Sequence, residues 1–226
     1  MVEEIVQIVV WGLYIFFFLF AIIVHEVAHG VAALTMGDRT PLLAGRITIN
    51  PIPHIDPVGS IAVPLLLFIT QKLAGIPYPV VLGWAKPVPV SMEVVVQRGG
   101  LVGAIWVSAA GILANLLLAF IAVGGMVLLP PNSLFAPLLL GFALINIVLA
   151  LFNLIPIPPI DGGRILEYFL LLIRADRLAF QLERLERFGF MIIFLLWFLP
   201  PVRELFGEAV DFLLDQFITI WSNLLG

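Results

Sequence analysis

Three residues with the spacing of a metal site stand in an apolar part of the chain. His25, Glu26 and His29 form an H-E-x-x-H pattern. On a helix, residues four apart share one face about one turn apart, so both imidazoles can bind a single ion. Glu26 can reach a water molecule at that ion without being a ligand, which suits a general base. The pattern predicts a zinc hydrolase site with His25 and His29 as ligands.

A third ligand is expected, because a catalytic zinc usually has three protein ligands. The chain has no cysteine, so the candidates are His54 and the acidic groups near the ends of apolar segments. Asp161 is the strongest of them, since prolines before it interrupt a helix and Gly162-Gly163 after it allows close approach of the backbone. An alternative is that Asp161 only caps the helix beginning near Gly162.

The composition identifies lipid as the surroundings of these groups. The 226 residues are 62% hydrophobic and 12% charged, whereas a soluble domain is roughly 45–50% apolar and 25% charged. Ionisable groups inside a membrane are expensive and need a shared partner, and a zinc ion supplies one. The alternative is that they hydrogen-bond across a helix bundle. No basic stripe is present, so a nucleic-acid partner is not expected.

Long apolar stretches predict an all-α polytopic membrane protein with about five to six hydrophobic segments. Residues 5–36 predict one long helix that ends at Gly37. Residues 101–129 and 134–155 predict an antiparallel pair, because the turn between them is short. The shorter run 58–74 predicts a re-entrant or interfacial segment, which in the re-entrant case returns through residues 75–82.

The remaining stretches predict a small β element and a peripheral end. β-Branched residues within 39–57 and the Pro87–Val90 stretch indicate extended segments. Near the C-terminus, Glu208, Asp211 and Asp215 have the spacing of one helical face, which favours an interfacial or weakly inserted helix over a clean span. We expect a single membrane-embedded domain over 1–226, with a core at about 5–173 and peripheral helices over 178–226.

Taken together, these motifs resemble the site-2 proteases, a family of intramembrane zinc metalloproteases that cut transmembrane helices. The resemblance joins H-E-x-x-H to the segment from Asn153 to Asp161-Gly162-Gly163, and it covers about residues 20–168. Further matching stretches are Gly111 to Asn115, Gly83 to Val90 and Asn50 to Ser60. They are similar to the compact branch without PDZ or CBS domains. Ile112 and Ser91-Met92 depart from that pattern, where the family commonly has proline and Asn-Pro.

The resemblance implies three core helices around an intramembrane zinc site with one zinc ion per chain, held by His25, His29 and Asp161. It implies that Asn153 helps polarise the scissile carbonyl and that Asn115 holds the core helices or a substrate strand. Helix-packing hydrogen bonds are the alternative role for both asparagines.

The role of His54 stays open at this point. It could be a pocket acid, a hydrogen-bond partner of the reaction intermediate, a second metal ligand, or a loop histidine bonded to Asp56. The substrates that the resemblance implies are transmembrane proteins in the lipid bilayer, cleaved in regulated intramembrane proteolysis. The natural substrate and the oligomeric state are left open.

A shared ion fixes the topology. If Asp161 meets the two histidines, the C-terminal ends of helices 5–36 and 134–155 lie on the same side of the membrane. Ten of the eleven basic residues, all but Arg203, then lie on that side or at its edge. The positive-inside rule predicts that this side is cytoplasmic, with the site nearer the cytoplasmic face of a prokaryotic cell membrane.

Two other classes of protein compete with a peptidase. A proteolytically inactive zinc-binding membrane chaperone or binding module would keep the ligands but tolerate loss of the Glu26 carboxylate. A metal transporter would need acidic residues along its pathway, and the membrane-crossing part of 101–129 has none.

Overall fold

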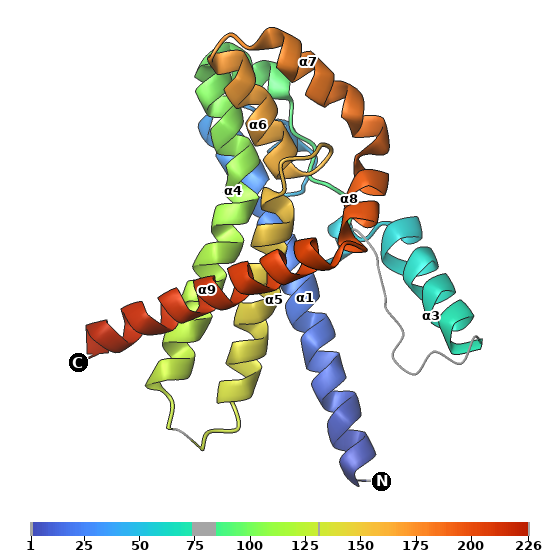
Figure 1. Ribbon diagram of the computed structural model, residues 1–226, viewed down its shortest axis with the longest axis vertical. Helices are drawn as coiled ribbons and strands as arrows, with labels where there is room; N and C mark the ends of the chain where they lie inside the picture. Colours follow the sequence, from blue (N-terminus) through green and yellow to red (C-terminus); the bar gives the residue numbers. More distant parts are fainter. Residues whose placement is uncertain (1, 74–84, 131, 226) are drawn as a thin grey trace.

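The computed structural model describes residues 2–73, 85–130 and 132–225 (Figure 1). Over these residues the regular secondary structure is helical. Helices α1 (Val2–Thr35), α4 (Met92–Leu128) and α5 (Ala136–Leu154) each contain a stretch long and apolar enough to cross a membrane. A bent pair, Asp176–Trp197 and Pro200–Leu225 at 89°, raises this number to four if it is one span. The polytopic all-α expectation is confirmed, with three or four spans among the described residues.

Helix α1 ends where the sequence predicts. Gly37 has a positive φ of 85°, a conformation that glycine adopts without steric cost. The Asp38 N–H then bonds to the Ala33 carbonyl at 3.0 Å, which closes the helix end. The Asp38 carboxylate accepts hydrogen bonds from the Thr40 N–H at 2.9 Å and the Ser91 N–H at 2.7 Å. The end of α1 is thereby fixed to the residue that precedes α4.

Helix α4 begins at Met92, nine residues before the predicted start at 101. The two parts meet at Gly100, whose φ of 65° and ψ of −166° put a kink between them. The predicted boundary therefore corresponds to a kink. Helices α4 and α5 run antiparallel through a short connection, as expected, and α4 packs against α1, α5 and α6 (Figure 1).

The core between α1 and α4 is built from small residues. Ala32 and Ala33 of α1 pack with Val95, Ala104 and Val107 of α4, and all five are buried. Small side chains let two helix backbones approach closely, which is how helices associate in lipid. This contact lies one to two turns from the histidines, so it holds the metal-binding face of α1 against α4.

The predicted β element is wrong for the described residues. Residues 47–49 form no strand, and Pro87–Val90 is extended but joins no ladder. Its neighbouring N–H groups are used elsewhere: the Lys86 N–H bonds to the His54 carbonyl and the Val88 N–H to the Glu26 carboxylate. Pro87 and Pro89 have no N–H to donate. A strand ladder on that edge is therefore excluded.

The short apolar run after residue 57 forms two helical pieces, η2 (Pro57–Ala62) and α3 (Val63–Leu73). At 1.5 Å per residue, the eleven residues of α3 extend ~16 Å, which is too short to cross a bilayer. The prediction that this run is not a lone crossing agrees with that length. The predicted return through 75–82 lies outside the described residues, as do Gly83 and Trp84 of the resembling motif.

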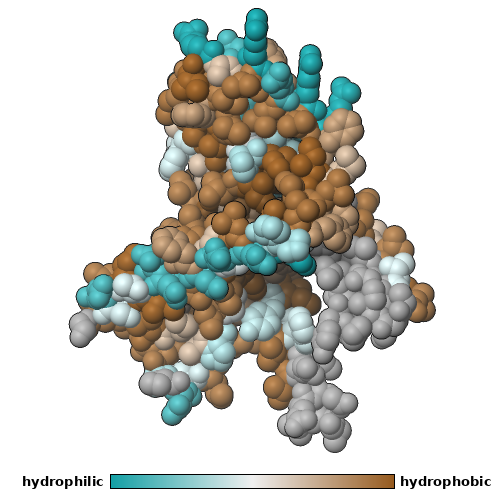
Figure 2. All heavy atoms as spheres, viewed as in Figure 1, coloured by the Kyte–Doolittle hydropathy of each residue, from teal (hydrophilic) through white to brown (hydrophobic). Residues whose placement is uncertain are grey.

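The C-terminal region follows α5 through α6 (Asp161–Leu172), α7 (Asp176–Arg184), α8 (Gly189–Trp197) and α9 (Pro200–Leu225). Helix α9 lies across α4 and α5 (Figure 1), and its acidic residues are exposed in a hydrophilic band (Figure 2). Its opposite face packs through Leu214, Phe217 and Trp221. The remaining short helices are α2 (Thr40–Leu43), η1 (Ile52–His54) and η3 (Leu185–Phe188).

Candidate metal centre

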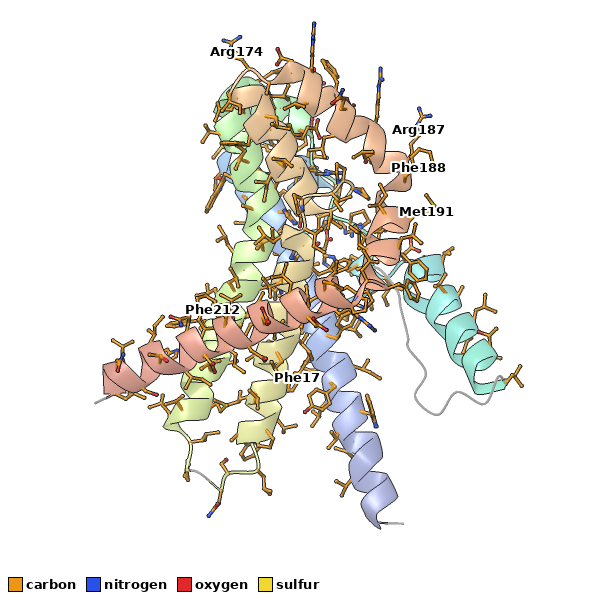
Figure 3. The ribbon with its side chains drawn as sticks, viewed as in Figure 1. Phe17, Arg174, Arg187, Phe188, Met191 and Phe212 are labelled. Carbon is orange, nitrogen blue, oxygen red and sulfur yellow. The ribbon has the colours of Figure 1, made fainter. Side chains whose placement is uncertain are left out.

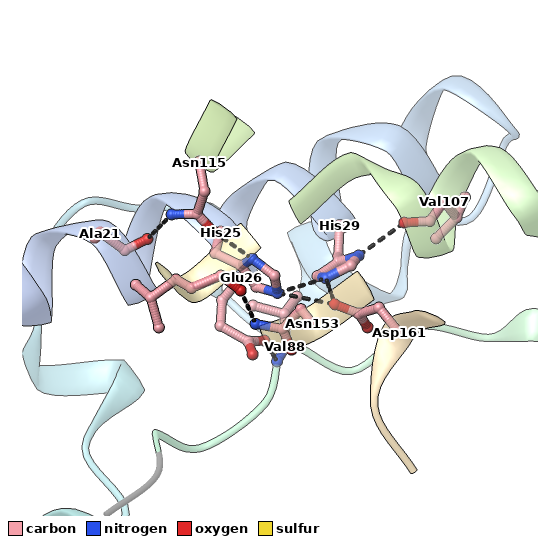
Figure 4. A network of polar contacts seen from close by, with 10 residues as sticks. Ala21, His25, Glu26, His29, Val88, Val107, Asn115, Asn153 and Asp161 are labelled. Carbon is pink, nitrogen blue, oxygen red and sulfur yellow. Dashed lines mark hydrogen bonds and ion pairs between the residues drawn. The ribbon is translucent and has the colours of Figure 1, made fainter. Parts of the chain in front are cut away.

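The two histidines of the H-E-x-x-H pattern lie on one face of α1. Their Nε2 atoms are 3.1 Å apart, and His25 is buried. Helix α1 is continuous through both residues, so the four-residue spacing places the rings one turn apart, as the sequence predicts. Both rings face α4 and the N-terminal end of α6 (Figure 4).

The other nitrogen of each imidazole is held by an acceptor. His29 Nδ1 lies 2.7 Å from the Val107 carbonyl oxygen, which can only accept, so this nitrogen carries the proton. His25 Nδ1 lies 2.7 Å from Asn115 Oδ1. Asn115 presents its oxygen there because its nitrogen is 3.2 Å from the Ala21 carbonyl. With the proton held on Nδ1, each ring in its neutral form presents a lone pair at Nε2.

Asp161 completes the cluster. Its Oδ2 lies 3.0 Å from His25 Nε2 and 3.3 Å from His29 Nε2. The alternative role as helix cap does not apply, because Ile160 occupies the cap position of α6 and Asp161 is its first residue. The C-terminal ends of α1 and α5 thus lie on the same side, as the shared-ion argument requires.

This donor set fits a zinc ion. One ligand atom from each of His25, His29 and Asp161 lies within 4.8 Å of the other two. Two lone pairs and a carboxylate oxygen that face one another repel, and a cation between them removes the repulsion. Two imidazoles and one carboxylate are a common protein ligand set of catalytic zinc.

The loop before Asp161 is shaped by backbone contacts that glycine permits. A side chain on Gly162 would collide with the Leu154 and Ile155 carbonyl oxygens, and one on Gly163 with the backbone of Pro158. Together with the prolines, this close packing brings the start of α6 back onto the end of α5. The role assigned to these glycines from the sequence is confirmed.

Glu26 lies beside the metal ligands and is tied to the segment 86–91. Its Oε2 accepts a hydrogen bond of 2.8 Å from the Val88 N–H (Figure 4). The Lys86 backbone anchors the same segment: the Lys86 N–H donates to the His54 carbonyl at 2.8 Å, and the Lys86 carbonyl accepts from Arg46 Nη2 at 2.5 Å. Glu26 is therefore positioned by Val88, 62 residues further along the chain.

Of the other predicted site residues, Asn115 bonds to a histidine of the cluster, whereas the side chains of Asn153 and His54 bond to main-chain carbonyls. Asn153 is one of the residues drawn in Figure 4, and its Nδ2 donates to the Leu149 carbonyl at 2.9 Å. Asn115 contacts His25 directly. His54 is buried and its Nε2 bonds to the Thr48 carbonyl at 2.9 Å. It is not one of the clustered ligands and supports the segment 86–91 through its backbone.

Sequence reasoning missed the role of Gly111, which fits against both rings. A Cβ atom built there would lie 2.5 Å from His25 Cε1 and 2.5 Å from His29 Nε2, so any side chain would displace the imidazoles. Its position four residues before Asn115 was a usable signal, because that spacing puts both on the α4 face toward His25. Asn146, which bonds to Asn115, was also missed.

Fold and site together have the features expected of a membrane-embedded zinc hydrolase, and comparison with known proteins gives the family. Residues 131–196, which include Asn153 and Asp161, match peptidase family M50. The chain is 33% identical over 217 residues to YwhC of Bacillus subtilis, whose name describes it as a zinc metalloprotease, with 89% of each chain covered. It is 27% identical over 199 residues to Rip2 of Mycolicibacterium smegmatis, also named as a zinc metalloprotease, with 87% of this chain and 71% of that one covered. No solved structure matches the chain.

The chain belongs to peptidase family M50, the site-2 protease family. It is an integral membrane metalloprotease of bacterial type, and its cofactor is zinc.

Proposed function

We propose that the protein hydrolyses peptide bonds within or near transmembrane helices of membrane protein substrates, as a step of regulated intramembrane proteolysis. The observation that carries this proposal is the convergence of His25, His29 and Asp161 beside Glu26 in a bundle of membrane-crossing helices. A hydrolytic centre built on such helices meets its substrates in the lipid layer.

In this proposal each site residue has a distinct role. His25, His29 and Asp161 would hold the zinc, which when bound would supply a Lewis acid for the peptide carbonyl and for the attacking water. Glu26 takes the proton of the attacking water and passes it to the leaving amine. Asn153 donates a hydrogen bond to the carbonyl oxygen of the scissile bond.

The segment 86–91 is the proposed contact for the substrate backbone. A peptide bond inside a helix is shielded by its own hydrogen bonds, so the substrate must be unwound and extended before attack. The Val88 N–H bonds to Glu26, which places this extended segment beside the base. A substrate running along its other edge would bring its backbone to the same place by strand addition.

The site is proposed to lie nearer the cytoplasmic face of a prokaryotic cell membrane. Arg174 and Arg187 project from the end of the molecule formed by α6 and α7 (Figure 3), where Figure 2 shows a hydrophilic cap. Helix α6 begins at Asp161, so this end is the one nearer the metal centre. Basic residues accumulate on the cytoplasmic side of membrane proteins.

The test uses Glu26→Gln, with Glu93→Gln as a matched control at an exposed glutamate outside the site. Each protein is purified in detergent, its zinc content is measured, and cleavage of a single-span substrate with Gly and Asn in mid-helix is followed. We expect Glu26→Gln to keep its zinc and lose cleavage by at least about a hundredfold, the scale of a general base. The control should match wild type.

Undiminished cleavage by Glu26→Gln would contradict the proposed base. A wild-type protein that binds zinc and the substrate but leaves the substrate intact would favour the inactive chaperone or binding module.

A further inference from the structure

A chain of buried amide groups leads from His25 away from the metal centre. His25 Nδ1 is bonded to Asn115 Oδ1, and Asn115 Nδ2 lies 2.8 Å from Asn146 Oδ1. Asn146 Nδ2 in turn donates to the Phe142 carbonyl at 2.9 Å. Asn115 and Asn146 are both 0% exposed. The mechanism proposed above gives Asn146 no role, so its burial in the bundle needs another explanation.

A main-chain carbonyl accepts a hydrogen bond from each of the two amide groups and favours one orientation of that amide. Two acceptors turn the Asn115 nitrogen away from His25 and its oxygen toward His25: the Ala21 carbonyl at 3.2 Å and, at the shorter distance of 2.8 Å, Asn146 Oδ1. The Phe142 carbonyl likewise takes the nitrogen of Asn146, which leaves the Asn146 oxygen for Asn115. Every donor in the chain then meets an acceptor, as buried polar groups require.

The orientation of the Asn146 amide affects which nitrogen of His25 carries the proton, as a turn of that amide by about 180° illustrates. A turned Asn146 would point its nitrogen at the nitrogen of Asn115, and relief of that clash would turn Asn115 as well. Asn115 would then offer a donor to His25 Nδ1, and the neutral imidazole would move its proton to Nε2. That proton would occupy the lone pair that faces His29 and Asp161.

We propose that Asn146 is a positioning residue that acts through Asn115 to hold His25 in the Nδ1–H tautomer, with Nε2 free for the metal. The proposal rests on the zinc site proposed above. It extends the support of His25 from its direct partner on α4 to α5, the helix that leads to Asp161. The three helices of the core thereby share one hydrogen-bonded connection to the ligand.

The experiment compares Asn146→Leu, which removes the acceptor, with Asn146→Asp, whose fully buried carboxylic acid in its protonated form keeps an oxygen facing Asn115 and an O–H donor facing the Phe142 carbonyl. Zinc affinity of the full-length protein in detergent is measured by competition with a chelator. In metal-free protein, ¹⁵N shifts of the three histidines report their tautomers. We expect Asn146→Leu to weaken zinc binding at least about tenfold, the scale of residues that support a ligand. The Asp variant should stay close to wild type.

A double variant separates this mechanism from general packing. If Asn146 acts through Asn115, then Asn146→Leu should weaken zinc binding no further in an Asn115→Leu background. The His25 ring should shift toward the Nε2–H tautomer in both single Leu variants, while His54 stays unchanged. Asn146→Ser carries the same expectation should the Leu variant not fold, because the shorter hydroxyl does not reach Asn115.

Unchanged zinc affinity and tautomer in folded Asn146→Leu would overturn the inference, as would additive losses in the double variant. Equal weakening by the Leu and Asp variants would also overturn it, since packing alone would then explain the effect. If the wild-type protein binds zinc and cleaves its substrate while these variants behave normally, only this inference fails. A wild-type protein that binds no zinc would overturn the proposed function too.

Discussion

Gly189, the first residue of α8, lies directly against the carbonyl oxygen of Pro158 in the loop before Asp161. A side chain at Gly189 would collide with that oxygen and approach the Pro159 ring. The C-terminal region expected to be peripheral therefore contacts the loop that delivers the third ligand.

Substitution of Gly189 should disturb the metal centre from outside it. We expect Gly189→Ala to displace the Pro158 backbone and weaken zinc binding about tenfold, the lower end of the range for loss of a residue that supports a ligand. Gly207→Ala in α9 is the matched control, because a Cβ there meets nothing within 4 Å. That control should be neutral or stabilising by up to ~1 kcal/mol. Equal zinc affinity in both variants would show that the loop adapts.

Gly111 gives a more direct test of the metal site. Gly111→Ala should displace both imidazoles and reduce zinc affinity by more than about a hundredfold, since the ligands themselves move. Gly12→Ala, at a position on α1 with nothing within 4 Å, should bind zinc like wild type. Competition with a chelator measures both. Retention of wild-type affinity by Gly111→Ala would mean that the rings bind metal from another position.

The Asp38 carboxyl should make the stability of the folded protein depend on pH in the acidic range. Burial raises the pKa of this carboxyl, but hydrogen bonds from Thr40 and the Ser91 N–H outweigh burial and lower the pKa below its ordinary value. Its stabilisation is therefore complete above the unfolded pKa, about 4, and is lost as the pH falls further. Asp38→Asn should lower the thermal midpoint at pH 7 and flatten its fall in acid. Parallel curves for both proteins would assign the acid dependence to other groups.

Trp221 should hold α9 against the core. Its indole N–H donates to the Phe120 carbonyl at 2.9 Å, its ring stacks on Phe120 at 5.1 Å, and it fills the space over Gly124. Trp221→Phe removes the hydrogen bond while keeping a ring, which should cost about 1 kcal/mol. Trp221→Ala should cost about 3 kcal/mol or more, the scale of a large-to-small core change. Thermal unfolding in detergent measures both, and equal midpoints would show that α9 is held elsewhere.

The sequence by itself determined the features that depend on near neighbours. Helical spacing placed His25 and His29 on one face, Gly37 ended α1, and the short turn made α4 and α5 antiparallel. These follow from local geometry and from the cost of polar groups in lipid, which act over a few residues or on composition.

Only the tertiary structure decided the features that depend on where distant backbone groups meet. Asp161, predicted as the third ligand, reaches the histidines because Gly162 and Gly163 let the loop fold back onto α5, whereas the place of His54, outside the cluster, was open from the sequence. The Pro87–Val90 stretch forms no strand, because neighbouring N–H groups bond to side chains and to a turn carbonyl. The direction of the Asn115 amide depends on carbonyls of two other helices. The residue spacing within one segment does not predict these contacts, because each contact forms only when two distant segments are folded against each other.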